Sequence, residues 1–367
     1  MDTSELESLI GFRERYKLTP VFLTTRLRSD TSDAISKFEE RSGCECPIIT
    51  REDIGANKGS PKWLKEVERR TAVTANRVLF IGRTDSPWDW KTAINGGAFF
   101  IGLDYREIDD DVREYALILP NIQETLAFVE VLFGDCDAYY TYRRDYETLI
   151  FRSLFDAGTT LNIGGDRSIT LQDVFTYESL PQETLVKARY ILALLFLVQL
   201  WKEEYLMSGV RLTMYPSHLA GTEDRKFMPY LRAFRGIAKT YVKGLLKRTE
   251  ETMDKSVLRA EKRHSEISFD REFSTLALKD SARIRDRVVV VFDDFSTSGM
   301  SLECARILLE NANVRKVVLC AIGKYGVTHT IYDQSGREIQ RIRLSKDQEA
   351  ERTLRDVFHQ LFTRYKF

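Results

Sequence analysis

An acidic pair followed by a run of small hydroxyl residues is the part of this sequence whose residue types could do chemistry. Asp293 and Asp294 come just before the loop residues Ser296, Thr297, Ser298, Gly299, Met300 and Ser301. Hydroxyl groups and backbone N–H groups around a glycine are suited to hold an anion. The segment is not a P-loop, because it lacks the Gly-x-x-x-x-Gly-Lys pattern and its acidic residues come first. We therefore predict an anion site at residues 296–301.

The flanking residues predict the elements that would position this site. Residues 288–291 are four consecutive valines, which is typical of a strand buried on both faces of a parallel sheet. After the loop, apolar residues recur at helical spacing from Leu302 to Leu309. The first N–H groups of a helix have no internal partner, and the helix dipole favours negative charge there. A strand, a hydroxyl loop and a helix N-terminus together therefore predict the anion site.

This order of an apolar strand, two acidic residues and hydroxyl-x-Gly-x-hydroxyl resembles the phosphoribosyl-diphosphate signature of type I phosphoribosyltransferases. The resemblance implies that the N–H groups of Ser298, Gly299 and Met300, with the hydroxyls of Thr297 and Ser301, cradle a ribose 5′-phosphate. It also implies that Asp293 and Asp294 face the ribose hydroxyls, directly or through a magnesium ion. The alternative is a plain strand–helix turn, in which the acidic pair caps the helix and Gly299 allows a tight turn.

Other candidates follow from position in this family. Residues 210–215 predict a strand and residues 227–246 a helix, so the loop 216–222 matches the family's diphosphate loop, with Ser217 and His218 as candidates. Residues 247–287 are highly charged and predict a solvated segment, matching the family's mobile loop. Arg259 and Arg263 are its diphosphate-side candidates, unless they only form an exposed helix face. After a strand at 316–322, Lys324 and Tyr325 are base-side candidates.

The N-terminal part carries a second resemblance. Residues 81–102, with Asp85 and Asp89, are similar to the C-terminal half of haloacid-dehalogenase-like (HAD) phosphatases, in which a carboxylate pair binds magnesium. Thr24 or Thr25 matches that family's phosphate-binding hydroxyl, and Lys58 or Lys62 matches its lysine. The family's nucleophilic Asp-x-Asp motif has no counterpart here, so no aspartyl-phosphate can form. This predicts a degenerate site and makes phosphatase activity an unfavoured alternative.

Composition and spacing set the overall expectation. The fold class is predicted to be α/β with two doubly wound parallel-sheet domains: HAD-like over 1–134, phosphoribosyltransferase-like over 138–345, then a C-terminal helix over 346–367. The 55 acidic and 55 basic residues balance, so net charge does not indicate nucleic acid as a partner. The apolar run at 190–201 is too short to span a bilayer and predicts a buried helix. Five scattered cysteines and no signal-peptide pattern predict a cytoplasmic protein.

Three functions are compatible with these features. The favoured one is a magnesium-dependent transferase that moves phosphoribose between phosphoribosyl diphosphate, or a nucleotide, and a nucleobase-like acceptor. A second is a non-catalytic nucleotide-sensing or effector module that uses the HAD-like half as scaffold, acting as a homo-oligomer or with a partner protein. Fusions that resemble this pairing are associated with bacterial stress-response and phage-defence gene clusters. A third is a two-step enzyme, against which the missing Asp-x-Asp motif counts.

Overall fold

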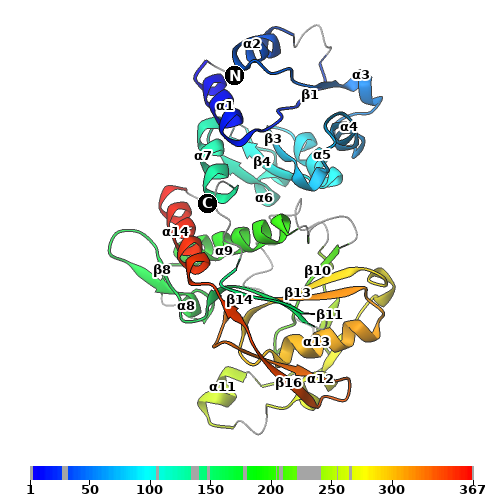
Figure 1. The fold of residues 1–367 in the computed structure, drawn as a ribbon, viewed down its shortest axis with the longest axis vertical. Helices are drawn as coiled ribbons and strands as arrows, with labels where there is room; N and C mark the ends of the chain where they lie inside the picture. The colour runs from blue at the N-terminus through cyan, green and yellow to red at the C-terminus, as the bar shows by residue number, and fades with distance from the viewer. Residues whose placement is uncertain are drawn as a thin grey trace. The chain divides into compact units, whose positions relative to one another are not determined.

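The computed structural model describes residues 3–26, 32–104, 107–133, 140–146, 149–176, 180–203, 205, 210–220, 241–253, 255–263 and 267–365. The described residues fall into two compact units: unit 1 up to residue 133 and unit 2 from residue 140 onward. Both units are α/β and contain parallel strands (Figure 1). The α/β class predicted from the alternation of apolar runs and helical patterns is therefore confirmed.

Unit 1 is built around short parallel strands. Strands β3, β4 and β5 form one parallel sheet, and β1 pairs with β2 in parallel. Helix α5 ends because Gly97 takes a left-handed conformation with φ of 90°. Its elements are α1 (Thr3–Tyr16), β1 (Phe22–Thr24), α2 (Ser32–Ser42), β2 (Ile48–Thr50), α3 (Arg51–Ile54), α4 (Lys62–Thr71), β3 (Leu79–Arg83), α5 (Trp88–Gly96), β4 (Phe99–Leu103), α6 (Asp110–Tyr115), β5 (Leu117–Leu119) and α7 (Ile122–Phe133).

Unit 2 is organised by a mixed six-stranded sheet in the order β10-β13-β14-β7-β6-β17. The first four strands are mutually parallel, β6 is antiparallel to β7, and β17 is antiparallel to β6. The elements up to β12 are β6 (Tyr142–Tyr146), β7 (Leu149–Asp156), β8 (Thr160–Asn162), β9 (Ser168–Thr170), α8 (Leu171–Thr176), α9 (Gln182–Lys202), β10 (Val210–Met214), β11 (Leu246–Arg248), α11 (Lys255–Ala260), α12 (Phe269–Ser274) and β12 (Leu276–Leu278). The remaining elements are β13 (Val288–Ser296), α13 (Met300–Asn311), β14 (Lys316–Lys324), β15 (Thr328–Tyr332), β16 (Glu338–Arg343), β17 (Ser345–Lys346) and α14 (Gln348–Arg364).

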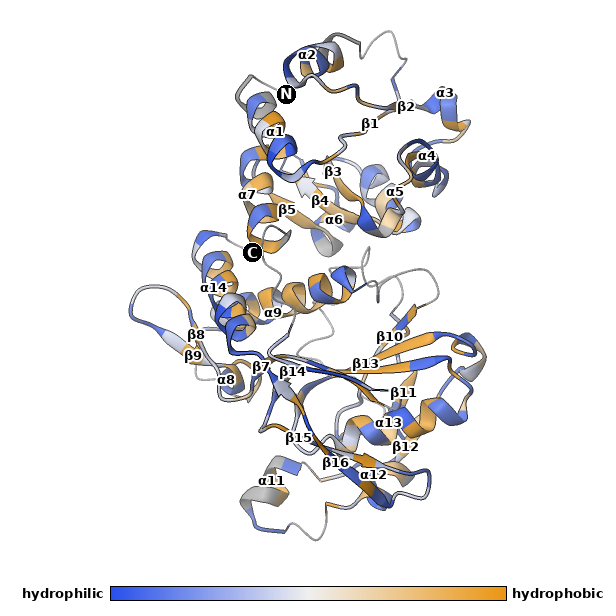
Figure 2. Ribbon diagram, in the orientation of Figure 1, coloured by the Kyte–Doolittle hydropathy of each residue, from blue (hydrophilic) through white to orange (hydrophobic). Residues whose placement is uncertain are grey.

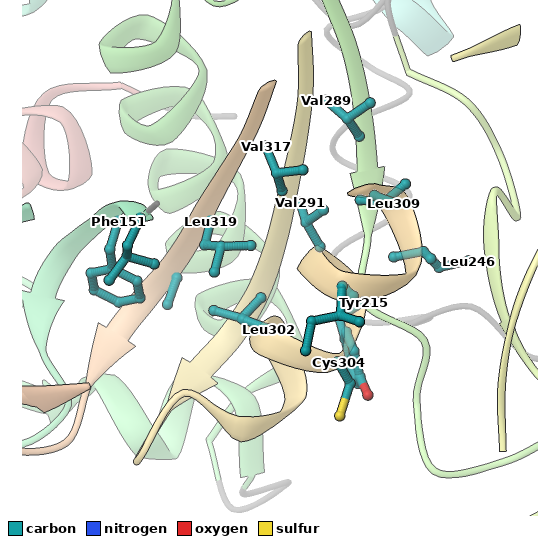
Figure 3. Close-up of a cluster of buried hydrophobic side chains, with 14 of the residues drawn as sticks. Phe151, Tyr215, Leu246, Val289, Val291, Leu302, Cys304, Leu309, Val317 and Leu319 are labelled. Carbon is teal, nitrogen blue, oxygen red and sulfur yellow. The ribbon is translucent and has the colours of Figure 1, made fainter. Parts of the chain in front are cut away.

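Strand β13 is covered on both faces, as its four valines predict. On one face Val289 and Val291 pack into a cluster with Leu302 and Leu309 of α13 (Figure 3). Successive side chains of a strand point to opposite faces. On the other face the ring of Phe292 lies 5.1 Å from that of Phe196 in α9. Helices α13 and α9 therefore cover the two faces of this strand.

Helix α9 is a core helix. By length and composition it could cross a membrane, with 21 residues and a mean hydropathy of 1.5, but 67% of that window is buried inside the protein. Its apolar residues stand out in the hydropathy view (Figure 2), and Leu192 to Val198 are fully or almost fully buried. The buried helix predicted around 190–201 is confirmed, and the cytoplasmic location stays a prediction.

Several sequence expectations need correction. The strand β7 was not predicted, although it lies inside the sheet between β14 and β6. The buried helix predicted at 190–201 is longer than its apolar run, since α9 extends from Gln182 to Lys202. The helix expected at 227–246 does not reach its predicted end, because Tyr241 forms a bridge with Leu212 and β11 begins at Leu246; residues 221–240 lie outside the described part. Most described charged residues of the segment 247–287 are exposed, as predicted, but the segment forms regular structure (the end of β11, then α11, α12 and β12) and buries Arg248 and Glu272.

Candidate functional site

The acidic pair lies at the carboxyl end of β13, between two parallel neighbours. Asp293 is still paired in register with Ala321 of β14, whereas β10 ends one step earlier, opposite Phe292. The carboxylate of Asp293 accepts a hydrogen bond from the N–H of Asp294 at 3.0 Å, and that of Asp294 from the N–H of Phe295 at 2.7 Å. The carboxyl ends of parallel strands are the usual edge for ligand sites in α/β folds.

The carbonyl groups of residues 297–299, in the loop after β13, accept hydrogen bonds from other parts of unit 2 and from α13. Lys324 donates a short hydrogen bond to the carbonyl of Thr297, and the N–H of Thr330 donates to Ser298 at 2.8 Å. The N–H of Glu303 donates to Gly299 at 2.9 Å. Within the described part of the chain, the N–H groups of Ser298, Gly299 and Met300 have no recorded acceptor. Three consecutive donors at the start of a 12-residue helix are thus available to an anion.

Gly299 is required by both its backbone and its surroundings. Its φ is 91°, and a Cβ built on it would lie 2.3 to 2.8 Å from three atoms of the His329 ring. His329 is fully buried, and its Nε2 lies 3.1 Å from Oε1 of Glu303. Arg306 also binds Glu303 at 2.7 Å, which fixes that carboxylate. The ring of His329 is therefore held in contact with Gly299 and limits the residue that fits there. The sequence analysis did not identify this histidine.

The environment of Asp293 disfavours its ionised form. Burial of the carboxyl group and the adjacent charge of Asp294 raise the pKa of Asp293 well above its usual value, although Lys255 acts in the opposite direction. Like charges on neighbouring carboxyl groups disfavour simultaneous ionisation. Two carboxylates side by side are also a suitable donor set for magnesium, which commonly binds through one or two carboxylates plus substrate phosphates. A divalent cation would offset this repulsion, so the pair fits that ion.

A buried charge cluster lies next to the loop, and the sequence analysis missed it. The Lys255 ammonium lies 2.5 Å from Oγ of Ser301 and 2.8 Å from Oε1 of Glu272. Arg248 and the hydroxyl of Tyr215 donate short hydrogen bonds to the same Oε1. Burial alone would raise the pKa of Glu272, but the charges of Lys255 and Arg248 with the hydrogen bonds lower it to about 2. Phe269 and Phe273, one helical turn apart, were the signal for a buried face on α12.

The diphosphate-side candidates are described only in part. His218 is exposed, and its carbonyl accepts a hydrogen bond from the N–H of Thr252 at 2.9 Å. Ser217 accepts a hydrogen bond from the N–H of Leu219 at 3.4 Å, so its hydroxyl stabilises the turn. Arg263 forms an ion pair with Glu261 at 2.9 Å. Arg259 belongs to α11, but its side chain lies outside the described part. Their role toward a diphosphate stays a prediction.

The two base-side candidates differ in exposure. Lys324 is fully buried, and its ammonium donates to the carbonyls of Thr297 and Tyr325, the latter at 2.9 Å. Burial lowers the pKa of Lys324 to about 8. Tyr325 is 38% exposed, and its ring lies 5.6 Å from that of Phe295. Lys324 therefore stabilises the loop through the carbonyl of Thr297, while Tyr325 presents an accessible ring at the same sheet edge.

In unit 1 the structure brings two of the predicted site residues together. Lys58 and Asp89 form an ion pair at 2.5 Å, and Asp89 also accepts a hydrogen bond from the N–H of Arg83 at 3.0 Å. Asp85, in contrast, is paired with the Arg83 guanidinium at Nε–Oδ1 3.0 Å. Asp85 thus has a cationic partner of its own, which lies two residues earlier in the chain.

Thr24 ends β1 opposite Thr50, the last residue of β2. The hydroxyl of Thr24 accepts a hydrogen bond from the N–H of Arg26 at 3.1 Å. Thr50 was not singled out from the sequence, and its side chain caps α3 by exchanging hydrogen bonds with Asp53. The two threonines therefore lie side by side at the same edge of the sheet, a neighbourhood that depends on the register of β1 and β2.

Replacing Lys58 with methionine is expected to destabilise unit 1 by about 2 kcal/mol, because Asp89 would lose its cation at a nearly buried position. Urea unfolding followed by tryptophan fluorescence measures this, since Trp63, Trp88 and Trp90 belong to unit 1 and only Trp201 does not. Lys62→Met is the matched control, because Lys62 is exposed. Equal losses in the two variants would show that the Lys58–Asp89 pair contributes nothing specific.

Within the described ranges, His, Cys, Asp and Glu do not form a group of three or more that could hold a metal on their own. A magnesium ion at Asp293 and Asp294 would thus need oxygen ligands from its substrate or from water. No protein-family model matches this chain, and no curated protein matches it.

Proposed function

We propose that unit 2 is a type I phosphoribosyltransferase-like domain that binds phosphoribosyl diphosphate or a ribose-5-phosphate nucleotide. One observation carries this proposal: the N–H groups of Ser298, Gly299 and Met300 are available while the loop carbonyls are engaged from inside. The hydroxyls of Thr297 and Ser301 flank these donors in the sequence. Such an arrangement favours a phosphate monoester, which accepts several hydrogen bonds and benefits from the helix dipole.

The acidic pair gives the proposal its second half. Asp293 and Asp294 lie one loop away from the phosphate donors, at the distance along the chain that the family signature has. Their carboxylates would bind the ribose hydroxyls or a magnesium ion shared with the diphosphate. In the transfer, the bond between the ribose and the diphosphate breaks and the acceptor nitrogen bonds to the ribose carbon. These residues would orient the ribose and offset the positive charge that develops on it.

Calorimetric titration with phosphoribosyl diphosphate and with AMP, each with and without magnesium, tests the proposed function. Tight and magnesium-dependent binding of phosphoribosyl diphosphate, in preference to AMP, is the result expected of a transferase. An acceptor screen with nucleobases would then identify the reaction. If the full chain binds neither ligand, the assignment of the anion site is wrong.

The second candidate function is a nucleotide-sensing module, with unit 1 as scaffold. One observation favours it: the Asp85 carboxylate in unit 1 pairs with Arg83, which argues for a structural role of the HAD-like site over phosphatase activity. Equal binding of AMP and phosphoribosyl diphosphate, insensitive to magnesium, would select this function.

Replacing Asp293 with asparagine is expected to weaken magnesium-dependent binding of phosphoribosyl diphosphate by about 10-fold or more, since charged hydrogen bonds to the ribose or the ion are lost.

The Asp293→Asn change should also raise the stability of the protein at neutral pH. Because the folded-state pKa of Asp293 is raised, the unfolded chain releases this proton first as pH rises, and the free energy of unfolding falls. Asparagine removes that loss. Calorimetry and thermal unfolding at pH 5 and pH 8 measure both effects; tighter binding by Asp293→Asn would contradict the assignment.

A further inference from the structure

We propose that Lys255 is an anion-binding residue of this site, which contacts a phosphate group held by the loop 297–301. The inference rests on the proposed function, because it assumes that a phosphate monoester occupies the loop. It adds a residue that the sequence motif does not contain: Lys255 lies 46 residues before Ser301 and comes from a different element, α11. The chemical class of ligand is a phosphate monoester of a sugar or nucleoside.

The contact between Lys255 and Ser301 carries the inference. The ammonium of Lys255 donates to Oγ of Ser301 at 2.5 Å. A hydroxyl that accepts from an ammonium keeps its own proton free to donate to a phosphate oxygen. That oxygen would lie about 2.7 Å from Oγ, and so within roughly 5 Å of the ammonium. At this separation the positive charge attracts the phosphate strongly, and a small rotation of the flexible lysine stem brings the two into direct contact.

Glu272 positions the ammonium of Lys255, and the charge of Glu272 is also neutralised by Arg248. Lys255 contacts Oε1 of Glu272 at 2.8 Å, and Arg248 and Tyr215 donate to the same oxygen. An ammonium has three N–H donors, and among the described residues Ser301 and Glu272 take two of them. The third donor is therefore available to a ligand. Should Lys255 turn further toward a phosphate, Glu272 would still be neutralised by Arg248.

The surroundings leave Lys255 both accessible and able to move. Its side chain is 24% exposed, so a ligand can reach it from solvent. A small pocket adjoins it between α11 and α12, lined by Thr252, Met253, Lys255, Leu258, Ile267, Ser268, Arg271 and Glu272. Arg271 adds a second cation to this wall. Lys255 thus borders both this pocket and Ser301, and the two cations of the pocket lining outnumber its one carboxylate, Glu272.

The test uses the full chain with Lys255→Met, Lys255→Arg and the control Lys247→Met, because Lys247 is an exposed lysine of the same segment. AMP binding is measured by calorimetry over a range of salt concentrations. Lys255→Met is expected to weaken AMP binding by about 10- to 100-fold and to flatten its salt dependence, because one cation facing the phosphate is lost. Lys255→Arg should restore most of the affinity, and Lys247→Met should bind as the wild type does.

The outcomes separate this inference from the proposed function. Unchanged AMP affinity in Lys255→Met, with AMP bound by the wild type, overturns the role of Lys255 and leaves the proposed function intact. A loss of affinity with an unchanged salt slope, accompanied by a lower melting temperature, assigns Lys255 a structural role and also overturns the inference. If the wild type binds neither AMP nor phosphoribosyl diphosphate, both fall together.

Discussion

Replacing Gly299 with alanine is expected to destabilise unit 2 by about 2 to 4 kcal/mol and to abolish binding of phosphorylated ligands. A left-handed backbone costs an alanine roughly 1–2 kcal/mol, and Gly299 has a φ of 91°. The added methyl group would also lie 2.3 Å from Cε1 of His329, which cannot move because it is buried and bound to Glu303. Overpacking of this kind typically costs about 1–3 kcal/mol. Urea unfolding and AMP calorimetry measure the two effects.

Gly326→Ala is the matched control for Gly299→Ala. Gly326 also has a positive φ, of 65°, but a Cβ there would have no atom within 4 Å. The control should therefore cost only the backbone penalty of about 1–2 kcal/mol and leave AMP binding intact. The difference between the two variants isolates the contact with His329. Equal costs would mean that the histidine ring does not limit the loop.

A double variant separates the ring contact further. Combining Gly299→Ala with His329→Ala should recover part of the stability lost by the single glycine change, since the methyl group would then meet open space. His329→Ala alone is destabilising, because it leaves a cavity and removes a partner of Glu303. The coupling energy between the two positions is the quantity of interest. A coupling energy of zero would contradict the conclusion that the ring of His329 excludes a side chain at position 299.

The central strand, the loop and the helix that follows could be predicted from sequence because local patterns specify them. Four valines in a row need burial on both faces, and Gly299 interrupts hydroxyl residues where a left-handed turn is required. The turn between the antiparallel strands β15 and β16 is specified in the same local way, since it contains Ser335 and Gly336, the latter with a positive φ of 80°. In each of these cases the residues that decide the structure are close together in the chain.

Strand β7 was not predicted, because it carries a buried charge whose partners come from other elements of the fold. Arg152 lies in the middle of β7 and is only 1% exposed. A charged residue at such a position normally argues against a buried strand. In the structure Glu203, 51 residues away, binds the guanidinium at 3.0 Å, and Asp145 binds it at 2.6 Å. The compensating charges come from other elements, and no local pattern indicates them.

The same limit explains why the candidate site was found only in part. Lys255, Glu272 and Arg248 belong to a segment whose many charges predict exposure to solvent. Arg248 and Glu272 leave solvent together because each neutralises the other: their side chains are 3% and 5% exposed, whereas that of Lys255 beside them is 24% exposed. Tertiary contact, rather than composition, decides which charges are buried. A motif in one strand and loop could be read, whereas a cluster assembled from β11, α11, α12 and α13 could not.

Replacing Glu272 with glutamine is expected to destabilise unit 2 by about 3 to 5 kcal/mol at pH 7. The variant leaves Arg248 and Lys255 without the carboxylate that neutralises both, and Arg248 is buried. Breaking a buried ion pair by removing one partner has costs of this size. Glu261→Gln is the matched control, because Glu261 pairs with Arg263 at an exposed position. Its cost should stay within about 0.5 kcal/mol.

The pH dependence gives an independent measurement of the same pair. Glu272 has a folded-state pKa of about 2, below its ordinary value of 4.5. The depressed pKa contributes stability that is fully present above the unfolded value and is lost as pH falls from about 4.5 toward 2. This contribution is about 3 kcal/mol. In that window the free energy of unfolding of the Glu272→Gln variant should fall less steeply with decreasing pH than that of the wild type. Parallel curves for the two proteins would show that the carboxylate of Glu272 is not held by Lys255 and Arg248, and the anion site would then lose the support on which the position of Lys255 depends.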